Sequence, residues 1–312
     1  MAKKKETNKI EAFLLIVLAI IGFVFGYGSD LYKDTKAFIK DIFHDEGKVV
    51  ETLDKVNVKV YFIDVGEADS ILIDSNGKYT LIDAGNNKDG PLLVDYFKEL
   101  GIKKFDYVIG THAHEDHIGG MDYIIRNFDI NHFYMPKTVV PTYTYEDVVK
   151  ELKNKSIKYT VPKIGTTFTS GKSEFEVLSV KDDEEDLNNG SIVLRMKYKD
   201  VAFMFMADVE SPVEEELIKK SDISADVIKI GHHGSRYGST SAFLNKVGAR
   251  YAVISVGKLN DYNHPHNQAL KRIEKAGLKL YRTDLKGTII FNTDGKNFKI
   301  ETVKTKTNME EE

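Results

Sequence analysis

Downstream of about Val56, hydrophobic residues occur in short runs, of which some alternate with polar residues and others follow helical spacing. The runs typical of strands are Val58–Asp64, Ser70–Ile73, Tyr79–Asp83, Phe105–Gly110, Asn131–Met135, Ser191–Met196, Val201–Met206 and Asp226–Ile230. The runs typical of helices are Pro91–Leu100, Met121–Phe128, Tyr143–Lys153 and Val213–Lys220. The first three strands predict an antiparallel meander and residues 191–206 a second hairpin, so the whole pattern indicates an α/β domain.

The N-terminal region has a different pattern, in which lysines are followed by an apolar segment. Lys3–Lys5 and Lys9 precede an uncharged run from Ala12 to Tyr27. At 1.5 Å per residue this run covers about 24 Å, slightly less than a hydrocarbon core of about 30 Å, and flanking side chains can make up the difference. By the positive-inside rule we expect a single-pass cell-membrane protein with a cytoplasmic N-terminus and an extracellular globular part. Cleavage of the segment as a signal peptide, which would give a secreted protein, is the alternative.

These patterns divide the chain into five parts. We expect a cytoplasmic basic tail over residues 1–9, a transmembrane anchor over 10–28, a juxtamembrane spacer with an amphipathic helix over 29–55, a globular domain over 56–303 and a charged tail over 304–312. The globular domain would carry any chemistry that the protein performs.

Composition excludes several classes of protein. The 312 residues are 42% hydrophobic and 11% aromatic, which suffices for a sizeable core and excludes wholesale disorder. The formal net charge is −4 with both signs well mixed, so any contact with DNA has to come from a local basic patch. The chain has no cysteine and no GxSxG motif, which excludes disulfides and a thiol nucleophile and gives no indication of a serine nucleophile.

The densest group of reactive side chains is the stretch THAHEDHIGG, residues 111–120, which holds three imidazoles and two carboxylates within six positions. It follows a predicted buried strand and precedes a predicted helix, the usual place for a site in an open α/β fold. His112 and His114 can point to one metal ion, and Asp116 and His117 can reach a second about 3.5–4 Å away. A histidine-rich turn without function is the competing interpretation, which the HxHxDH spacing disfavours.

Three further segments contribute candidate residues. Asp208 lies at the end of a predicted buried strand, where a carboxylate is costly unless it is paired or bound to a metal. Another predicted strand runs into residues 231–235, GHHGS, where His233 is the preferred ligand and His232 the alternative. His264, in the segment NHP, follows a later apolar run, and we expect it at the same edge of the domain as the other histidines, which we call the rim.

Together these motifs resemble those of the metallo-β-lactamase superfamily and, in more detail, the hydrolase domain of ComEC-type competence proteins. The matching segments run in family order: FIDVGEADS (62–70), LIDAG (81–85), THAHEDHIGG (111–120), NNGS (188–191), MADVE (206–210), GHHGS (231–235) and NHP (263–265). The resemblance implies that residues 56–303 form a four-layer αββα sandwich with two divalent metal ions, Zn or Mn, at its edge. It also implies that Asp208 bridges the two ions and that Asp83 orients the histidine loop through backbone hydrogen bonds.

Two positions depart from the family pattern. Glu67-Ala68 stands where the family usually has Gln-Gly. Many superfamily enzymes have a further histidine ligand before the bridging aspartate, and the matching place here holds two asparagines, as in the competence family. We expect Asn189 to supply this ligand, with Asn188 as the alternative. An amide oxygen is a weaker ligand than imidazole, which favours a harder ion such as Mn²⁺.

The expected reaction is hydrolysis by a water molecule that the two ions activate. Asp116 is the candidate to orient that water or accept its proton, and His264 to bind a substrate phosphate or carry a proton. Asp64 and Asp69 either form a turn or support the site. The resemblance implies a phosphodiesterase, most directly a nuclease that acts on DNA together with competence or envelope machinery.

Two other functions also fit the sequence: a phosphoesterase acting on a cell-envelope or small-molecule substrate, and a non-catalytic, metal-stabilised ectodomain that binds a partner. The presence of the expected ligands disfavours the second. A polyanionic substrate is favoured by a set of basic residues in the C-terminal half, unless these are ordinary surface residues. The set comprises Lys229, Arg236, Lys246, Arg250, Lys258, Lys271 and Arg272.

Overall fold

The computed structural model describes residues 56–182, 185–220 and 222–304 of the chain. The predicted basic tail, anchor and spacer lie outside the described residues, as do positions 305–312 of the predicted charged tail. Within the described ranges, no helix is both long enough and apolar enough to cross a membrane.

The strands of the described part form two sheets, one of eight strands and one of seven. The first has the order β15 (Phe298–Val303), β14 (Thr288–Thr293), β1 (Val58–Phe62), β2 (Ile71–Ser75), β3 (Tyr79–Ile82), β4 (Lys104–Ile109), β5 (Asp129–Tyr134), β6 (Tyr159–Thr160). The second has the order β13 (Lys279–Arg282), β12 (Tyr251–Ile254), β11 (Val227–Lys229), β10 (Val201–Phe205), β9 (Val193–Tyr198), β8 (Ser173–Ser179), β7 (Thr167–Ser170). Strands β1 to β3 pair antiparallel, as do β9 and β10, which confirms the predicted meander and hairpin.

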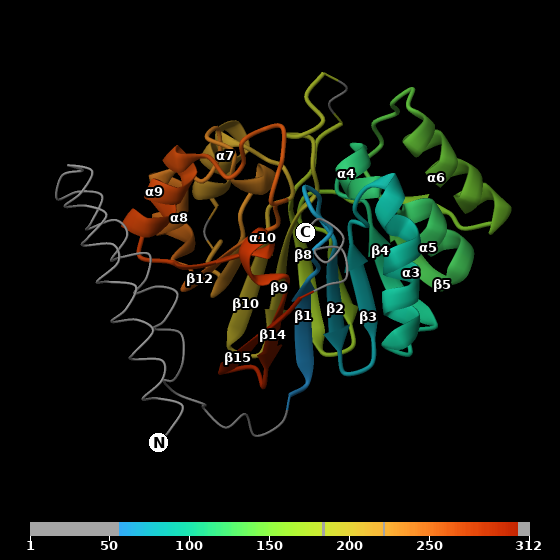
Figure 1. Ribbon diagram of the computed structural model, residues 1–312, viewed down its shortest axis with the longest axis horizontal. Helices are drawn as coiled ribbons and strands as arrows, with labels where there is room; N and C mark the ends of the chain where they lie inside the picture. Colours follow the sequence, from blue (N-terminus) through green and yellow to red (C-terminus); the bar gives the residue numbers. More distant parts are fainter. Residues whose placement is uncertain (1–55, 183–184, 221, 305–312) are drawn as a thin grey trace, which may run out of the picture. The chain divides into compact units, whose positions relative to one another are not determined.

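Helices cover the outer face of each sheet, so that the domain has four layers (Figure 1). The first sheet is covered by α3 (Gly90–Glu99), α5 (Met121–Asn127) and α6 (Tyr143–Asn154), and the second by α7 (Ser211–Ile218), α8 (Ser241–Val247) and α9 (Asn267–Lys275). The connections contain the short helices η1 (Asn87–Asp89), α4 (Glu115–Ile118), η2 (His232–Gly234) and α10 (Thr283–Lys286). The predicted αββα sandwich is thereby confirmed.

Strands β1 and β2 bury both of their faces. In β1, Val60 and Phe62 point into the core between the two sheets, whereas Tyr61 belongs to the outer core beneath the helices. In β2, Ile71 faces inward and Leu72 outward in the same way. Because side chains alternate along a strand, burial on both faces requires apolar residues at successive positions. This explains why apolar residues stand at successive positions in Val60–Phe62 and Ile71–Ile73.

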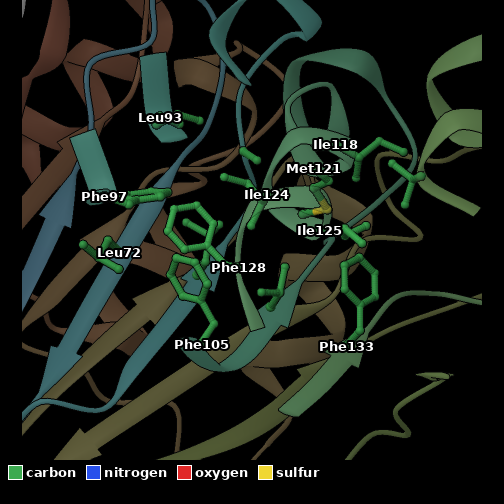
Figure 2. Packing of buried hydrophobic residues seen from close by; sticks show 14 of the residues in the cluster. Leu72, Leu93, Phe97, Phe105, Ile118, Met121, Ile124, Ile125, Phe128 and Phe133 are labelled. Carbon is green, nitrogen blue, oxygen red and sulfur yellow. The ribbon is translucent and has the colours of Figure 1, made fainter. Parts of the chain in front are cut away.

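Aromatic packing in the outer core fixes two helices on the strand that precedes the histidine loop (Figure 2). Phe97 of α3, Phe105 of β4 and Phe128 after α5 meet edge to face, with ring centroids 5.5, 6.2 and 5.2 Å apart. Such pairs each contribute about 0.5–1.5 kcal/mol beyond the burial of their surface. The positions of α3 and α5 relative to β4 are therefore well determined.

The sequence predictions did not include β8, β13, β14, β15 or α8. Strand β14 pairs antiparallel with β1, so that Val58 lies opposite Thr293 although the whole domain separates them in sequence. Local pattern does not reveal such a partner, because strand pairing is decided by the packing of side chains against their neighbours in space.

We expect the Phe62→Ala substitution to lower the free energy of unfolding by about 3–5 kcal/mol, because it opens a cavity between the sheets. The Phe62 side chain is fully buried, with its ring centroid 5.9 Å from that of Phe291 and 6.3 Å from that of Phe205. Urea unfolding of the full-length chain measures the change. The exposed Leu92 of α3 supplies the control, since Leu92→Ala should change stability by at most about 0.5 kcal/mol. Equal losses in the two variants would contradict this account of the core.

Candidate metal centre

The candidate residues lie on loops that follow strands of both sheets. The HxHxDH loop follows β4 of the first sheet, and Asp208, the 231–235 loop and His264 come after β10, β11 and β12 of the second. Strands β10, β11 and β12 run parallel to one another, so their carboxyl ends meet at one edge. The two groups of loops converge at this edge.

The first cluster consists of His112, His114 and Asp208. The Nε2 atom of His112 lies 3.0 Å from the Nδ1 atom of His114 and 4.0 Å from Oδ2 of Asp208. Both His112 and Asp208 are almost completely buried, with 2% and 1% of their surface exposed. These converging nitrogens match the pair that the sequence assigned to one metal ion.

The second cluster consists of Asp116, His117, Asp208 and His233, whose ligand atoms all lie within 4.8 Å of one another. Oδ2 of Asp208 is 3.3 Å from Nε2 of His117 and 3.7 Å from Nε2 of His233. Oδ2 of Asp116 is 3.6 Å and 3.2 Å from the same two nitrogens. Asp208 therefore faces both clusters, as a residue shared between two ions has to do.

Several buried polar atoms at this centre fit the presence of metal ions. Within the described part of the chain, Oδ1 of Asp208 and Nε2 of His117 have no hydrogen-bond partner of acceptable geometry. Buried polar atoms are rarely left without a partner, and each exception calls for an explanation such as an ion. Imidazole and carboxylate groups suit Zn, Mn or Fe. The donor set therefore fits divalent metal ions, with His112, His114, Asp116, His117, Asp208 and His233 to hold them.

The two candidate amide ligands, Asn189 and its alternative Asn188, differ in their hydrogen bonds. Oδ1 of Asn189 accepts the backbone N–H of Glu210 at 2.9 Å, and its Nδ2 donates to Asp186 at 2.6 Å. Oδ1 of Asn188, in contrast, is buried and has no hydrogen-bond partner among the described residues. This segment adjoins the histidine loop, since Ile192 N–H donates to the carbonyl of Thr111 at 2.9 Å.

Both histidines of the 231–235 loop reach the centre, but their partners differ. His233 is held by a hydrogen bond between its Nδ1 and the carbonyl oxygen of Ser255 at 2.9 Å, which leaves Nε2 for a metal. Nδ1 of His232 lies 2.8 Å from Oε1 of Glu210, and its Nε2 lies 3.9 Å from Asp208. Both have left-handed backbone angles, with φ of 47° and 49°, a strained conformation typical of functional sites. His233, which belongs to the second cluster, is the better placed ligand.

Asp83 orients the HxHxDH loop. Its Oδ1 accepts the backbone N–H of Thr111 and its Oδ2 accepts the Thr111 hydroxyl, both at 2.8 Å. Oδ2 also lies 2.8 Å from Nδ1 of His117, which turns Nε2 of this ring toward Asp208. A carboxylate behind a metal-binding histidine fixes the tautomer and the direction of the ring. The geometry agrees with the supporting role that the resemblance implies.

The two acids of the FIDVGEADS motif have different surroundings. Oδ1 of Asp64 accepts the N–H of Gly66 at 3.3 Å, which is the contact of a turn-forming residue. Asp69 is buried 2.7 Å from Nζ of Lys229, and its other oxygen lies 3.7 Å from Nδ1 of His233. Asp69 therefore supports the site. Lys229 is completely buried in this ion pair, so it cannot belong to a substrate-binding surface as we had expected.

The two glycines that end the histidine motif allow the loop to pack closely. A Cβ atom on Gly119 would lie 2.3 Å from the backbone of Asn86 and Asn87, and one on Gly120 would lie 2.4 Å from the carbonyl oxygen of Ala84. No larger side chain fits without moving the backbone. The glycines thus hold α4, which contains Asp116 and His117, against the end of β3.

The histidines of the centre differ in pKa because their surroundings differ in charge. Burial lowers the pKa of His112 well below its ordinary value, and it also lowers the pKa of His114. Burial alone would do the same to His117 and His233, but the carboxylates around them, foremost Asp208, raise the pKa of His117 well above its ordinary value and that of His233 to about 9. In the metal-free protein, His117 and His233 therefore hold protons that a metal ion has to displace.

Sequence reasoning missed three partners of the site residues. Glu210 contacts His232, Lys229 contacts Asp69, and Oε1 of Glu67 lies 2.8 Å from Nδ1 of His264. Glu67 lies in the FIDVGEADS motif and Glu210 in the MADVE motif, and this position was the signal in the sequence that could have pointed to them. Their targets lie far along the chain, so only the tertiary structure reveals the contacts.

We expect metal affinity to rise with pH between about pH 7 and the pKa of His233 near 9, with protons released on binding. The affinity rises with pH because His233 is protonated below this pKa in the metal-free protein and has to lose its proton to bind an ion. Calorimetric titration of the metal-free chain with Zn²⁺, in buffers that differ in ionisation enthalpy, counts the released protons. Binding without proton release at neutral pH would contradict the assignment.

We expect Asp83→Asn to weaken metal binding by about 10–100-fold. The single oxygen of the amide cannot accept from both the backbone N–H of Thr111 and the ring of His117, which meet different oxygens of the carboxylate. Titration with a competing chelator measures the affinity. The matched control is Asp95→Asn on the exposed side of α3, which should leave the affinity unchanged. Equal affinities in both variants would remove Asp83 from its supporting role.

Known proteins resemble this chain in both sequence and fold. ComE operon protein 3 of Bacillus subtilis (strain 168) is 30% identical over 252 residues, which cover 74% of this chain and 32% of that protein. Competence protein ComA of Neisseria gonorrhoeae is 27% identical over 240 residues, covering 73% and 31%. The chain thus spans about a third of the length of these curated relatives.

Solved structures with little sequence identity share the fold. The metallo-β-lactamase fold protein YhfI from Bacillus subtilis has a TM-score of 0.51 at 14% identity, covering 75% of this chain and 99% of that chain. Igni18, a metallo hydrolase from Ignicoccus hospitalis, has a TM-score of 0.50 at 17% identity, covering 75% and 98%. The family model of the metallo-β-lactamase superfamily matches residues 63–258, and this chain belongs to that superfamily.

Proposed function

We propose that this protein is a metal-dependent phosphodiesterase that hydrolyses DNA. The observation that carries the proposal is the pair of ligand clusters that share Asp208, beside a rim that holds His264. When bound there, two divalent ions would lower the pKa of a water molecule and polarise a phosphoryl oxygen.

Asp116 is suited to orient the attacking water and accept its proton. Its side chain is 29% exposed, whereas that of Asp208 is 2% exposed, so Asp116 is the carboxylate of the second cluster that reaches solvent. The two histidine nitrogens beside it, on His117 and His233, hold the Asp116 carboxylate in place. A general base has to lie within reach of the proton that it takes, which this position allows.

His264 is suited to act on the far side of the reacting phosphate. Its ring centroid lies 5.4 Å from that of His232 and 6.1 Å from that of His233. Its side chain is 5% exposed, so its position is fixed by the protein rather than by solvent. It can bind a phosphate oxygen or give a proton to the leaving group, as we expect from the sequence.

DNA is favoured as the substrate by the name of one relative, Competence protein ComA of Neisseria gonorrhoeae, and by the nearby exposed cations. Of the predicted basic set, Arg236 and Lys258 are exposed on the loops near His232 and His264. Arg272 instead donates to three carbonyl oxygens of residues 236–239 and thereby supports this loop. A phosphoester of the cell envelope remains the substrate that a negative result with DNA would favour.

We expect the full-length chain, loaded with Mn²⁺ or Zn²⁺, to cut DNA and to hydrolyse bis-p-nitrophenyl phosphate. Asp208→Ala and His114→Ala should each lower both activities by on the order of 100-fold or more, because each removes a ligand. The control is His132→Ala, since His132 lies on β5, where its ring stacks on Tyr107. Unchanged turnover in both ligand variants would refute the site. Turnover of the small diester without cutting of DNA would refute DNA as the substrate.

We also propose that residues 10–28 tether the domain to the outer face of the cell membrane, by the charge pattern around this segment. Protease added to intact cells should then digest the domain while a cytoplasmic marker survives. A domain that is digested only after lysis would contradict this location.

A further inference from the structure

Glu67 and His264 form a partly buried contact between two loops that lie 197 positions apart in the sequence. Oε1 of Glu67 lies 2.8 Å from Nδ1 of His264, and Oε2 accepts the backbone N–H of Gly257 at 2.8 Å. The two side chains are only 16% and 5% exposed. Both oxygens of the carboxylate are thus engaged, one by the histidine and one by the loop that leads to it.

The backbone around His264 is held as firmly as its ring. Oδ1 of Asn260 accepts the N–H of His264 at 2.8 Å, and Nδ2 of the same amide donates to the carbonyl of His264, also at 2.8 Å. The ring of Tyr262 stacks on the imidazole at 5.6 Å with an angle of 18°. Together with the contact of Glu67, these contacts hold the imidazole ring of His264 in one orientation.

The chemistry of the contact determines which ring nitrogen meets the substrate. An ionised carboxylate only accepts hydrogen bonds, so Nδ1 of His264 has to carry the proton that points at Glu67. Nε2 is then the ring nitrogen that does not face Glu67, and the rings of His232 and His233 lie near this imidazole. Glutamine at position 67 would not be equivalent. It has one acceptor oxygen, and its NH₂ group would face either the Gly257 N–H or the His264 Nδ1–H.

We propose that Glu67 is a positioning residue that fixes the tautomer and orientation of His264 so that Nε2 protonates the leaving oxygen. The inference rests on the proposed phosphodiester hydrolysis. The water oxygen bonds to phosphorus and its proton passes to Asp116, while the bond from phosphorus to the sugar oxygen breaks. A His264 ring with a proton on both nitrogens gives the proton on Nε2 to this oxygen and becomes the neutral Nδ1–H tautomer, so that the products are a phosphate monoester and an alcohol. The carboxylate of Glu67 keeps the hydrogen bond to Nδ1 throughout, so that Nε2 is the nitrogen that gives up its proton.

The test compares leaving groups that do and do not need a proton. A sugar oxygen leaves poorly without one, whereas p-nitrophenolate leaves readily. In the metal-loaded full-length chain, we expect Glu67→Gln to lower kcat on single-stranded DNA by about 10-fold and His264→Ala by about 100-fold. On bis-p-nitrophenyl phosphate, both losses should stay below about 3-fold. The exposed Glu174→Gln on β8 is the matched control and should leave both rates unchanged.

The double variant shows whether Glu67 acts through His264. We expect Glu67→Gln to cause no further loss when His264 is already alanine, because coupled residues are not additive. Metal content, measured by elemental analysis, should equal that of the unsubstituted chain in every variant. Equal losses of activity on both diesters, additive losses in the double variant, or loss of metal would each overturn the proposal.

A spectroscopic measurement separates this proposal from the choice of substrate. In the Zn²⁺-loaded chain with ¹⁵N-labelled histidine, the neutral ring of His264 should be the Nδ1–H tautomer, and its signal is identified by its absence from His264→Ala. Glu67→Gln should shift the ring toward the Nε2–H tautomer. An unchanged tautomer would overturn the role of Glu67 even if DNA is cut. If the unsubstituted chain cuts no DNA but shows this shift, the positioning role stands and only the proposed substrate falls.

Discussion

The carboxylate of Asp208 is buried at the edge of the two sheets, and the arrangement of the centre depends on how its charge is compensated. A carboxylate removed from water is costly unless positive charge or a metal ion surrounds it. Burial by itself would raise the pKa of Asp208, but His117 and His233, which come from different sheets, lower it well below its ordinary value. The loops of the two sheets are therefore held together by electrostatic attraction as well as by packing.

A layer of supporting contacts keeps the ligands of both sheets in place. Asp83 holds Thr111 and the ring of His117 in the first sheet. In the second, the carbonyl oxygen of Ser255 accepts from the ring of His233. These partners are themselves buried, so the ligand atoms face one another before any ion binds. Preorganisation of this kind is what a metal site requires for affinity and for correct geometry.

The rim of the centre differs in character from its interior. Inside, the histidines are bound to fixed partners, whereas Asp116 reaches solvent and Arg236 is exposed on a nearby loop. His264 connects the two regions, because its ring is buried but lies beside the ligand histidines. A phosphodiester bound at the rim would meet water on the side of Asp116 and a fixed imidazole on the other. The αββα fold provides these positions, and the chemistry depends on the loops.

The sequence by itself indicated the strands with an apolar pattern, the position of the HxHxDH loop after β4 and the choice of Asp208, His233 and His264 as candidate site residues. These features are local, because each depends on spacing or on residues adjacent to a strand. The tertiary structure decided the pairing of β14 with β1 and the contacts of the supporting residues. It also engaged the amide of Asn189 in hydrogen bonds and placed Lys229 in the interior. These contacts join residues as far apart in the sequence as Val58 and Thr293, and a local pattern contains no information about such distant partners.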